Sequence, residues 1–344
     1  MKKIIFIIVL IFISFGIAAG YHFYKIFYEK NTSFDQEYVH LIIPTNSTKD
    51  QLLDSISNYV EDLSKFIKAA NHKDYFSNFK SGRFKIEKDF NNNEIINSIR
   101  SKNIPINITF NNIQTLNQLM GEIASKIEAD STSLLNAFND KSFLNNLKLN
   151  EDSVFSLFIP NTYQFFWNTN AIQFRDRIVN EFDIFWNENR LENSKKIDLN
   201  PHEVITLASI VQMETPKVDE RPTVAGVYLN RLEKRMKLQA DPTIIYTIKK
   251  RDGFDTKIRR VLYKDLRIKS PYNTYLNRGL PPGPIITPDI SAIEAVLNPR
   301  EHSFLYFVAD VENPGYHMFS RTNAEHNRKK RQYTDWLRKK NIRR

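Results

Sequence analysis

The sequence predicts an α+β protein with an N-terminal transmembrane helix, a small α+β module and a larger mixed α+β domain. Three observations lead to this prediction. An apolar run opens the chain, a strand–helix–helix–strand pattern follows, and helical stripes alternate with short strands beyond residue 200. We expect an anchor over 1–28, the small module over 36–104, a helical connector over 105–199, the larger domain over 200–327 and a basic tail over 328–344.

The apolar run covers residues 4–20, and aromatic residues prolong it to about 20 residues, which is enough to cross a bilayer. Residues 18–20 (AAG) resemble a signal-peptide cleavage site, but the run is long for such a peptide, so we expect an uncleaved anchor. Lys2 and Lys3 precede the run. The positive-inside rule therefore predicts a single-pass protein of the plasma membrane, with a cytoplasmic N-terminus and the remaining chain outside.

Composition limits the chemistry. The chain has no cysteine, which excludes disulfide bonds, thiolate metal sites and a cysteine nucleophile. The formal net charge is +10, and residues 328–344 carry nine Lys or Arg side chains against one acid, Asp335. Such a tail can bind anionic lipid headgroups, acidic wall polymers or nucleic acid, and an outward-facing chain makes nucleic acid the least favoured partner. The simplest interpretation is a solvated helix end.

The small module is predicted from local signals. Residues 38–44 and 82–86 alternate like strands, and Thr48 with Gln51 forms a capping box that opens a helix. A second helical piece is expected at 74–79 and a short helix from Asn93. In the connector, a further helix is expected over 131–147 after a capped helix that begins at Thr115.

The stretch on which function depends is a helix that should begin at Asn200. Asn200 is a good N-cap, Pro201 suits the first helical position, and Glu203 completes a capping box. Glu214 extends one apolar face of this helix, and Pro216 should end the helix close to that glutamate. The helix dipole and partial burial would both raise the pKa of Glu214, as a general acid requires. On the pattern alone, a solvated glutamate at the edge of the face is the favoured interpretation, since most such residues are solvated.

The chain after Glu214 supplies further candidates. A helix is expected from Pro222, followed by a polar turn at 239–243 and a strand at 244–246. Asp241 in that turn is either a second functional carboxylate or a turn residue before proline. The aromatic segment 155–163, which includes Tyr163, either packs in a core or lines a sugar-binding cleft. Strands are expected at 303–309, buried, and at 317–319. The histidine spacings match no metal-binding pattern, and no cofactor is implied.

A set of motifs, in one order, resembles the YceG-like endolytic murein transglycosylases, the MltG family. The motifs are ASIVQMET, VAGVYLNRL, LQADPTIIY, YNTY, GLPPGPI and LYFVAD, followed by HMFS and HN. The resemblance is collinear from Phe158 to Asn327, and the anchor and the 82–86 strand fit the LysM-like region of that family. Many members have a glutamate at the position of Gln212 and an aspartate at that of Asn161, so this chain departs from them at both.

The resemblance implies that Glu214 is the catalytic residue of a membrane-anchored enzyme that cuts peptidoglycan glycan strands internally. Such an enzyme forms 1,6-anhydroMurNAc ends, terminates nascent strands and partners peptidoglycan synthases. The remaining substrate-binding candidates are Gln239, Asp241, Asn273, Tyr275 and Tyr163, each of which could equally hold a loop or a core together. Two alternatives stay open: a lysozyme-like muramidase that uses Glu214 and Asp241, and a non-catalytic glycan-binding scaffold.

Overall fold

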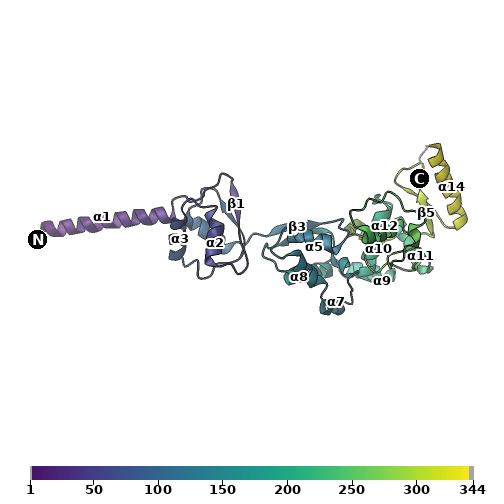
Figure 1. The fold of residues 1–344 in the computed structure, drawn as a ribbon, viewed down its shortest axis with the longest axis horizontal. Helices are drawn as coiled ribbons and strands as arrows, with labels where there is room; N and C mark the ends of the chain where they lie inside the picture. Colours follow the sequence, from purple (N-terminus) through teal and green to yellow (C-terminus); the bar gives the residue numbers. More distant parts are fainter. Residues whose placement is uncertain (1, 341–344) are drawn as a thin grey trace. The chain divides into compact units, whose positions relative to one another are not determined.

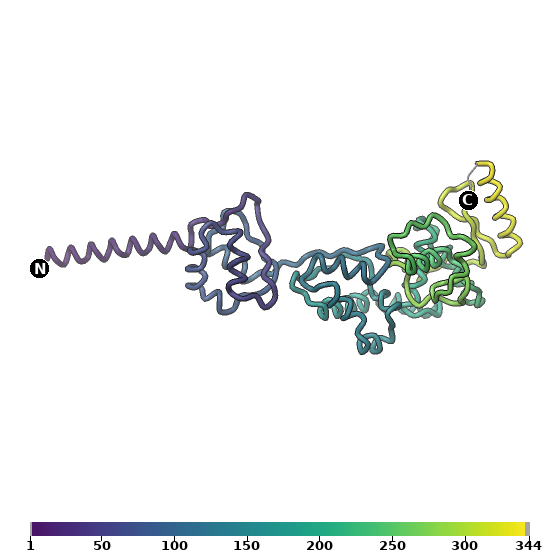
Figure 2. Tube along the Cα trace, in the orientation of Figure 1, coloured from purple at the N-terminus to yellow at the C-terminus, as the bar shows by residue number. Residues whose placement is uncertain are grey.

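A computed structural model describes residues 2–340 of the chain (Figure 1). The last residues of the predicted basic tail, 341–344, lie outside the described residues. The chain forms two compact units, and Figure 2 traces its path through them. Unit 1 holds the residues up to Ile108 with the segments Lys126–Ala129 and Gln164–Asn170; unit 2 holds Thr109–Ser125, Asp130–Tyr163 and the chain from Ala171 onward. Most of residues 105–199 therefore belong to unit 2.

Figure 1 draws α1 (Lys2–Phe27) as one continuous helix. The helix is 26 residues long, and nearly all of its side chains are exposed. At 1.5 Å per residue it measures about 39 Å, which exceeds the hydrocarbon thickness of a bilayer. Within the part of the chain that the structure describes, it is the one helix long and apolar enough to cross a membrane. This agrees with the predicted anchor.

The rest of unit 1 centres on an antiparallel pair of strands, β1 (Tyr38–Ile43) and β2 (Gly82–Glu87), in which Tyr38 pairs with Glu87 and Ile43 with Gly82. The helices α2 (Lys49–Ser57) and α3 (Leu63–His72) connect the strands, and α4 (Asn92–Ser101) follows them. The predicted element order and the Thr48–Gln51 capping box are confirmed. The helix expected at 74–79 is wrong: Asp62 caps α3 eleven residues earlier, and Asp74 has a φ of 49°, which breaks helical geometry.

The end of α1 is part of the core of unit 1. Ile26 and Phe27 are buried there, and the buried Asn92 side chain donates a 2.7 Å hydrogen bond to the carbonyl oxygen of Ile26. Asn31 in turn donates to the Asn92 side chain at 2.7 Å and accepts from the backbone of Asp62 at 2.8 Å. Buried amides that lose such partners are costly. These bonds fix the anchor helix to the module.

Strand β3 (Ile106–Phe110) pairs with β4 (Asn161–Phe165), and the division between the two units runs through both strands. Five helices lie between or after these strands: α5 (Leu116–Ala124), α6 (Ser131–Phe138), α7 (Lys141–Leu147), α8 (Ala171–Phe185) and α9 (Glu188–Lys196), with the 3₁₀ turn η1 (Val154–Leu157). The helix predicted over 131–147 is confirmed for residues 131–138 and 141–147, but the segment forms two helices instead of one. Asn139 ends α6, and the Asp140 side chain caps α7 by accepting from the amide of Phe143.

Helix α10 (Pro201–Glu214) lies at the centre of unit 2 and packs against α9, α11 (Arg221–Glu233), α12 (Asp241–Asp252) and α13 (Ile290–Leu297). Its predicted start is confirmed: Asn200 and Glu203 form the capping box, and Pro201 occupies the first turn. Its predicted end at Glu214 is also confirmed. All eight residues of 204–211 are buried, so the helix is surrounded by protein and has no single apolar face.

Two expectations about the C-terminal part need correction. The strand expected at 244–246 is wrong, because Asp241 and Pro242 begin helix α12 and place those residues in its middle. The strands β5 (Tyr306–Ala309) and β6 (His317–Ser320) are confirmed as an antiparallel pair, but β5 is half-buried instead of buried. The 3₁₀ turn η2 (Asp265–Arg267) precedes them, and α14 (Asn323–Lys339) packs against both.

The close approach of α11 to the segment 300–302 gives a prediction about two glycines. A methyl group at Gly226 would lie 2.8 Å from the Arg300 carbonyl oxygen, whereas one at Gly121 in α5 would meet nothing within 4 Å. We expect Gly226→Ala to lower the free energy of unfolding by about 1–3 kcal/mol through overpacking. Gly121→Ala is the matched control and should raise it by about 0.5–1 kcal/mol through helix propensity. Denaturant unfolding measures both, and equal signs would contradict the close packing.

Candidate active site

A cavity of about 420 Å³ in unit 2 brings several of the predicted residues together. Its volume lies within the range typical of ligand-binding sites. The walls come from the end of α10, from α11, from the turn before α12, from β5 and from α14. The lining residues are Glu214, Tyr228, Arg231, Leu238, Gln239, Asp241, Tyr275, Tyr306, Phe307, Asn323, His326, Asn327 and Lys330. Of the candidates found in the sequence, Glu214, Gln239, Asp241 and Tyr275 therefore share one site.

Glu214 is the last residue of α10 and is partly buried at the cavity wall. Thr215 follows it in an extended conformation, so the helix stops at the glutamate. The hydroxyl of Tyr228 on α11 donates a 2.6 Å hydrogen bond to Oε1 of Glu214. Tyr228 is almost fully buried, and its ring contacts Phe307 edge-on. The carboxyl group is therefore held in one orientation by a rigid neighbour.

Burial raises the pKa of Glu214 to about 7. The hydrogen bond from Tyr228 opposes this shift because it stabilises the carboxylate, and the negative charge of Asp241 adds to it. Burial and the adjacent Glu214 carboxylate raise the pKa of Tyr228 well above its usual value, so its hydroxyl keeps its proton and remains a donor. Glu214 can thus hold a proton near neutral pH and can also release it, as an acid and base group must.

Asp241 lines the same cavity as Glu214 but is more exposed to solvent. It is exposed at the start of α12, and the Tyr275 hydroxyl donates to its Oδ1 at 2.6 Å. Gln239 lines the cavity and has a backbone φ of 51°. Its backbone N–H donates to the carbonyl oxygen of Thr274 at 3.1 Å. The turn before α12 and the loop that carries Tyr275 therefore support each other.

Arg231 lines the cavity as a structural cation. Its guanidinium is buried and donates to the carbonyl oxygens of Leu305 and Leu238, each at 2.6 Å. It also lies over the ring of Tyr306, 5.2 Å from the centroid. These contacts use Nε and Nη1 of the side chain, and they tie α11 to β5 and to the turn before α12.

Helix α14 supplies a further wall through Asn323, His326, Asn327 and Lys330. His326 stacks on Tyr306 with ring centroids 5.3 Å apart. No local sequence signal places Lys330 at the site, because it belongs to the basic run 328–344, which is expected to form a tail. The spacing of these residues, at i, i+3, i+4 and i+7, is the signal that could have found them.

Two of the predicted binding residues are placed elsewhere. Asn273 is fully buried, and its amide donates to the carbonyl oxygens of Leu266 and Ile268 while accepting from the backbone of Tyr275. Tyr163 is 6% exposed, and its hydroxyl donates to the carbonyl oxygen of Ile159 at 2.7 Å. Neither residue lines the cavity. Through these bonds to the backbone, Asn273 holds a loop together and Tyr163 holds a core together.

The two positions that depart from the family pattern also lie outside the cavity lining. The Gln212 side chain donates to Asn112 at 2.8 Å and accepts from the backbone of Asp289 at 2.5 Å, so it bridges two loops. Asn161 is exposed and accepts from the amide of the next residue, Thr162, at 2.8 Å. Both departures are accommodated by local contacts that do not reach Glu214.

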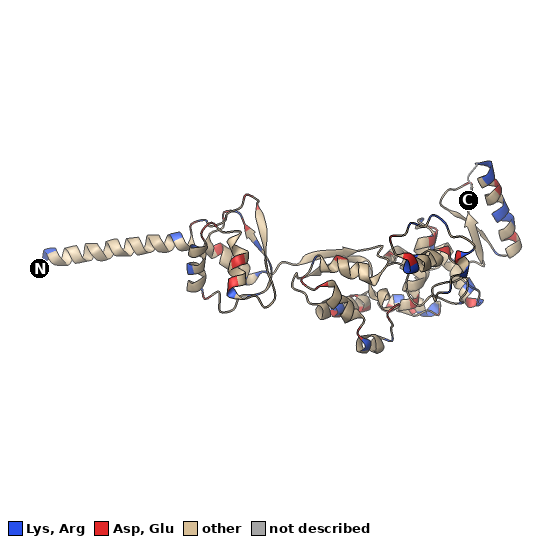
Figure 3. Cartoon of the chain, viewed as in Figure 1, with Lys and Arg blue, Asp and Glu red and all other residues tan. Residues whose placement is uncertain are grey.

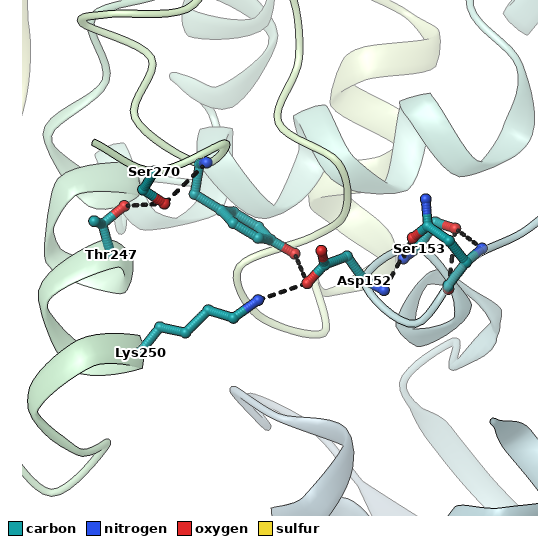
Figure 4. Close-up of polar contacts among 7 residues, drawn as sticks. Asp152, Ser153, Thr247, Lys250 and Ser270 are labelled. Carbon is teal, nitrogen blue, oxygen red and sulfur yellow. Dashed lines mark hydrogen bonds and ion pairs between the residues drawn. The ribbon is translucent and has the colours of Figure 1, made fainter. Parts of the chain in front are cut away.

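A second cavity in unit 2, of about 280 Å³, was not predicted. Lys250 of α12 and the hydroxyl of Tyr272 both donate to Asp152 Oδ1, at 2.6 and 3.2 Å (Figure 4). The backbone amide of Tyr272 donates to the hydroxyl oxygen of Ser270, which lies 3.5 Å from the hydroxyl oxygen of Thr247. These contacts fix α12 and the start of the loop that carries Tyr275. These contacts therefore help to hold in place the loop that carries Tyr275, a residue of the cavity lining.

Several known proteins are similar to this chain over part of its length. The family model described as the YceG-like family matches residues 41–332. The chain is 33% identical over 230 residues to an endolytic murein transglycosylase of Bacillus subtilis (strain 168), and this match covers 63% of the chain and 62% of that protein. It is 38% identical over 134 residues to an endolytic murein transglycosylase of Streptococcus pneumoniae, covering 39% of the chain and 24% of that protein. The chain thus spans less than two thirds of these relatives.

A solved structure extends the comparison to the fold. The crystal structure of a YceG-like protein from Listeria monocytogenes superposes with a TM-score of 0.55 at 27% sequence identity. This match covers 86% of the chain and 99% of that structure. Since the family model also covers most of the chain, from the first strand of unit 1 to helix α14, the protein belongs to the YceG-like family.

Proposed function

We propose that the protein is a membrane-anchored endolytic lytic transglycosylase of peptidoglycan. In this proposal it cleaves MurNAc–GlcNAc bonds within glycan strands and leaves 1,6-anhydroMurNAc ends. The observation that carries the proposal is Glu214, a carboxyl group with a pKa raised to about 7, held by Tyr228 at the wall of a 420 Å³ cavity. Relatives that align with this chain are named endolytic murein transglycosylases.

One carboxyl group suffices for the proposed chemistry. Protonated Glu214 gives its proton to the glycosidic oxygen as the bond from that oxygen to C1 of MurNAc breaks. The resulting carboxylate then takes the proton from the C6 hydroxyl of the same sugar, whose oxygen bonds to C1 and closes the anhydro ring. Tyr228 already donates to Oε1, so proton transfer falls to Oε2. The glutamate ends the cycle protonated, and no water is consumed.

A muramidase is the second candidate, because Asp241 lines the same cavity as Glu214. A retaining hydrolase needs its two carboxyl groups about 5–5.5 Å apart, and an inverting one about 6.5–9.5 Å apart. Against this role, Asp241 is exposed and receives a 2.6 Å hydrogen bond from Tyr275. We assign Asp241 and Tyr275, together with Gln239, to binding of the sugar substituents.

The remaining features complete the proposal. Helix α1 would span the plasma membrane once, with the N-terminus in the cytoplasm and the catalytic core 200–327 outside. The module 36–104 has the element order βααβ, which supports a LysM-like assignment. On that basis we assign this module to glycan binding. Placement at the outer face of the membrane would let the enzyme terminate nascent strands beside peptidoglycan synthases.

The first prediction concerns Glu214→Gln. Loss of the acid and base group should lower the rate of release of anhydro-ended fragments about 10²- to 10⁴-fold, since general acid–base catalysis contributes on that order. The measurement is mass spectrometry of fragments from purified peptidoglycan strands treated with the full-length protein. Glu233→Gln, at the exposed end of α11, is the matched control and should keep full activity. Full activity of Glu214→Gln would disprove the proposal.

The second prediction separates the two candidate reactions. A lytic transglycosylase leaves an anhydro end, whereas hydrolysis leaves a reducing end that is one water heavier. We expect anhydro ends only, and we expect Asp241→Asn to keep this product while binding strands about 3- to 10-fold more weakly, as loss of one exposed charged hydrogen bond would cause. Reducing ends that disappear in Asp241→Asn would instead identify a muramidase.

The third prediction concerns pH. Because the pKa of Glu214 is raised from 4.5 to about 7 in the folded state, the folded protein holds this proton more tightly than the unfolded chain. Wild type should therefore lose stability as pH rises from about 4.5 to about 7. Glu214→Gln lacks this penalty and should be more stable than wild type at pH 8, by on the order of 2 kcal/mol.

Denaturant unfolding at pH 4.5 and pH 8 measures this effect, and the difference between the two proteins should shrink at the lower pH. Glu233→Gln should show no such pH-dependent gain. The same titration predicts that cleavage by wild type declines above about pH 7, because the acid form of Glu214 is lost. The measured quantity is the gain in free energy of unfolding of Glu214→Gln over wild type. A larger gain at pH 4.5 than at pH 8 would contradict the raised pKa.

A further inference from the structure

The wall formed by α14 is held firmly against the β5–β6 pair. The Thr322 side chain caps the helix, and Lys329 donates to the carbonyl oxygen of Phe319 at 2.5 Å while pairing with Glu325 at 3.0 Å. The stack of His326 on Tyr306 adds a third point of attachment. Residues that α14 presents to the cavity are therefore fixed relative to β5, which contributes Tyr306 and Phe307 to the same cavity.

Lys330 differs from the other charged groups in this cavity. Tyr228 and Tyr275 donate to the two carboxylates, Glu214 and Asp241. The Arg231 guanidinium is buried, and its Nε and Nη1 donate to backbone carbonyl oxygens. Lys330 is exposed and forms no ion pair with another described residue. It lies on a helix rich in Lys and Arg (Figure 3), so its ammonium group is available to an anionic ligand.

The neighbouring His326 does not provide a second positive charge. Burial lowers its pKa, and the positive charges of Lys330 and Arg231 lower it further, so the imidazole is neutral at neutral pH. Its Nδ1 is buried without a hydrogen-bond partner among the described residues. The cavity thus has two carboxylates bound by tyrosine hydroxyls and, from α14, one unpaired cation.

We infer that Lys330 binds a carboxylate on the C3 substituent of MurNAc and so selects substituted glycan strands over neutral ones. The inference rests on the proposed function. The sugar rings of peptidoglycan are neutral, and its carboxylates lie on this substituent: the lactyl carboxylate of strands without peptides, or the carboxylates of the stem peptide. A lysine ammonium is a compact charge with three donors, which suits a carboxylate whose orientation varies.

Binding to a variant that cannot cleave tests the inference. We compare full-length Glu214→Gln with Glu214→Gln/Lys330→Gln on three labelled strand preparations. One bears stem peptides, the second has been freed of peptides by an amidase so that the lactyl carboxylates are exposed, and in the third those carboxylates have been converted to amides. We expect Lys330→Gln to weaken binding about 10-fold for carboxylate-bearing strands, as for loss of one charge-assisted hydrogen bond, with no change for the neutral strands.

Two controls accompany this comparison. Arg331→Gln removes the same charge from the next residue of α14, which is exposed and does not line the cavity, and it should leave binding unchanged. Lys330→Arg keeps the charge and should retain most of the affinity. Weakening for only one of the two charged preparations identifies the lactyl or the peptide carboxylate as the ligand. Unchanged binding in Lys330→Gln, or equal weakening for the neutral strands, would overturn the inference.

The same proteins with Glu214 restored separate this inference from the proposed function. If wild type forms anhydro ends and Lys330→Gln cleaves charged strands with an unchanged kcat/KM, the inference fails and the function stands. If wild type forms no anhydro ends, the function fails, and the binding comparison still decides whether Lys330 recognises a carboxylate. Thermal unfolding of each variant checks that the fold is retained.

Discussion

The active site depends on one hydrogen bond, from the hydroxyl of Tyr228 to Glu214. Its two partners are supplied by adjacent helices, and each helix is fixed by burial: α10 is enclosed on all sides, and α11 approaches the 300–302 segment so closely that Gly226 has no room for a methyl group. Arg231, one turn after Tyr228, then binds β5 and the turn before α12. The pKa of Glu214 is raised because these packed elements bury its carboxyl group.

Local chemistry explains which parts of this structure could be read from the sequence. The capping box at Asn200 and the proline after Glu214 act within a few residues of the helix ends, so they set the limits of α10 directly. The strand expected at 244–246 followed from β-branched and aromatic residues, but Asp241 and Pro242 start a helix, and its packing against α10 outweighs that weak propensity. Propensity decides little where tertiary contacts are numerous.

The site residues also differ in whether local sequence or tertiary packing determines their position. Glu214 could be proposed because its motif singles it out, whereas the helix pattern alone also fits a solvated glutamate. Asn273 could not be assigned correctly, because whether an asparagine in a loop faces a cavity or the backbone depends on the path of that loop. In the sequence, Lys330 is one of many positive charges, and only the packing of α14 against β5 places it at the cavity. The hydrogen bonds that Lys250 and Tyr272 donate to Asp152 join three segments that lie far apart in the sequence, so no local sequence pattern predicts them. Long-range packing supplied each of these placements.

The join between α1 and unit 1 has a mechanical consequence. Ile26 and Phe27 sit in the core of the module, and Asn92 holds the Ile26 carbonyl oxygen, so no free chain separates the apolar helix from the folded body. A flexible tether would let the module sample all directions above a membrane. A helix built into the module acts instead as a rigid shaft. When such a helix changes its tilt to match a thicker or thinner bilayer, the module must turn with it through the same angle.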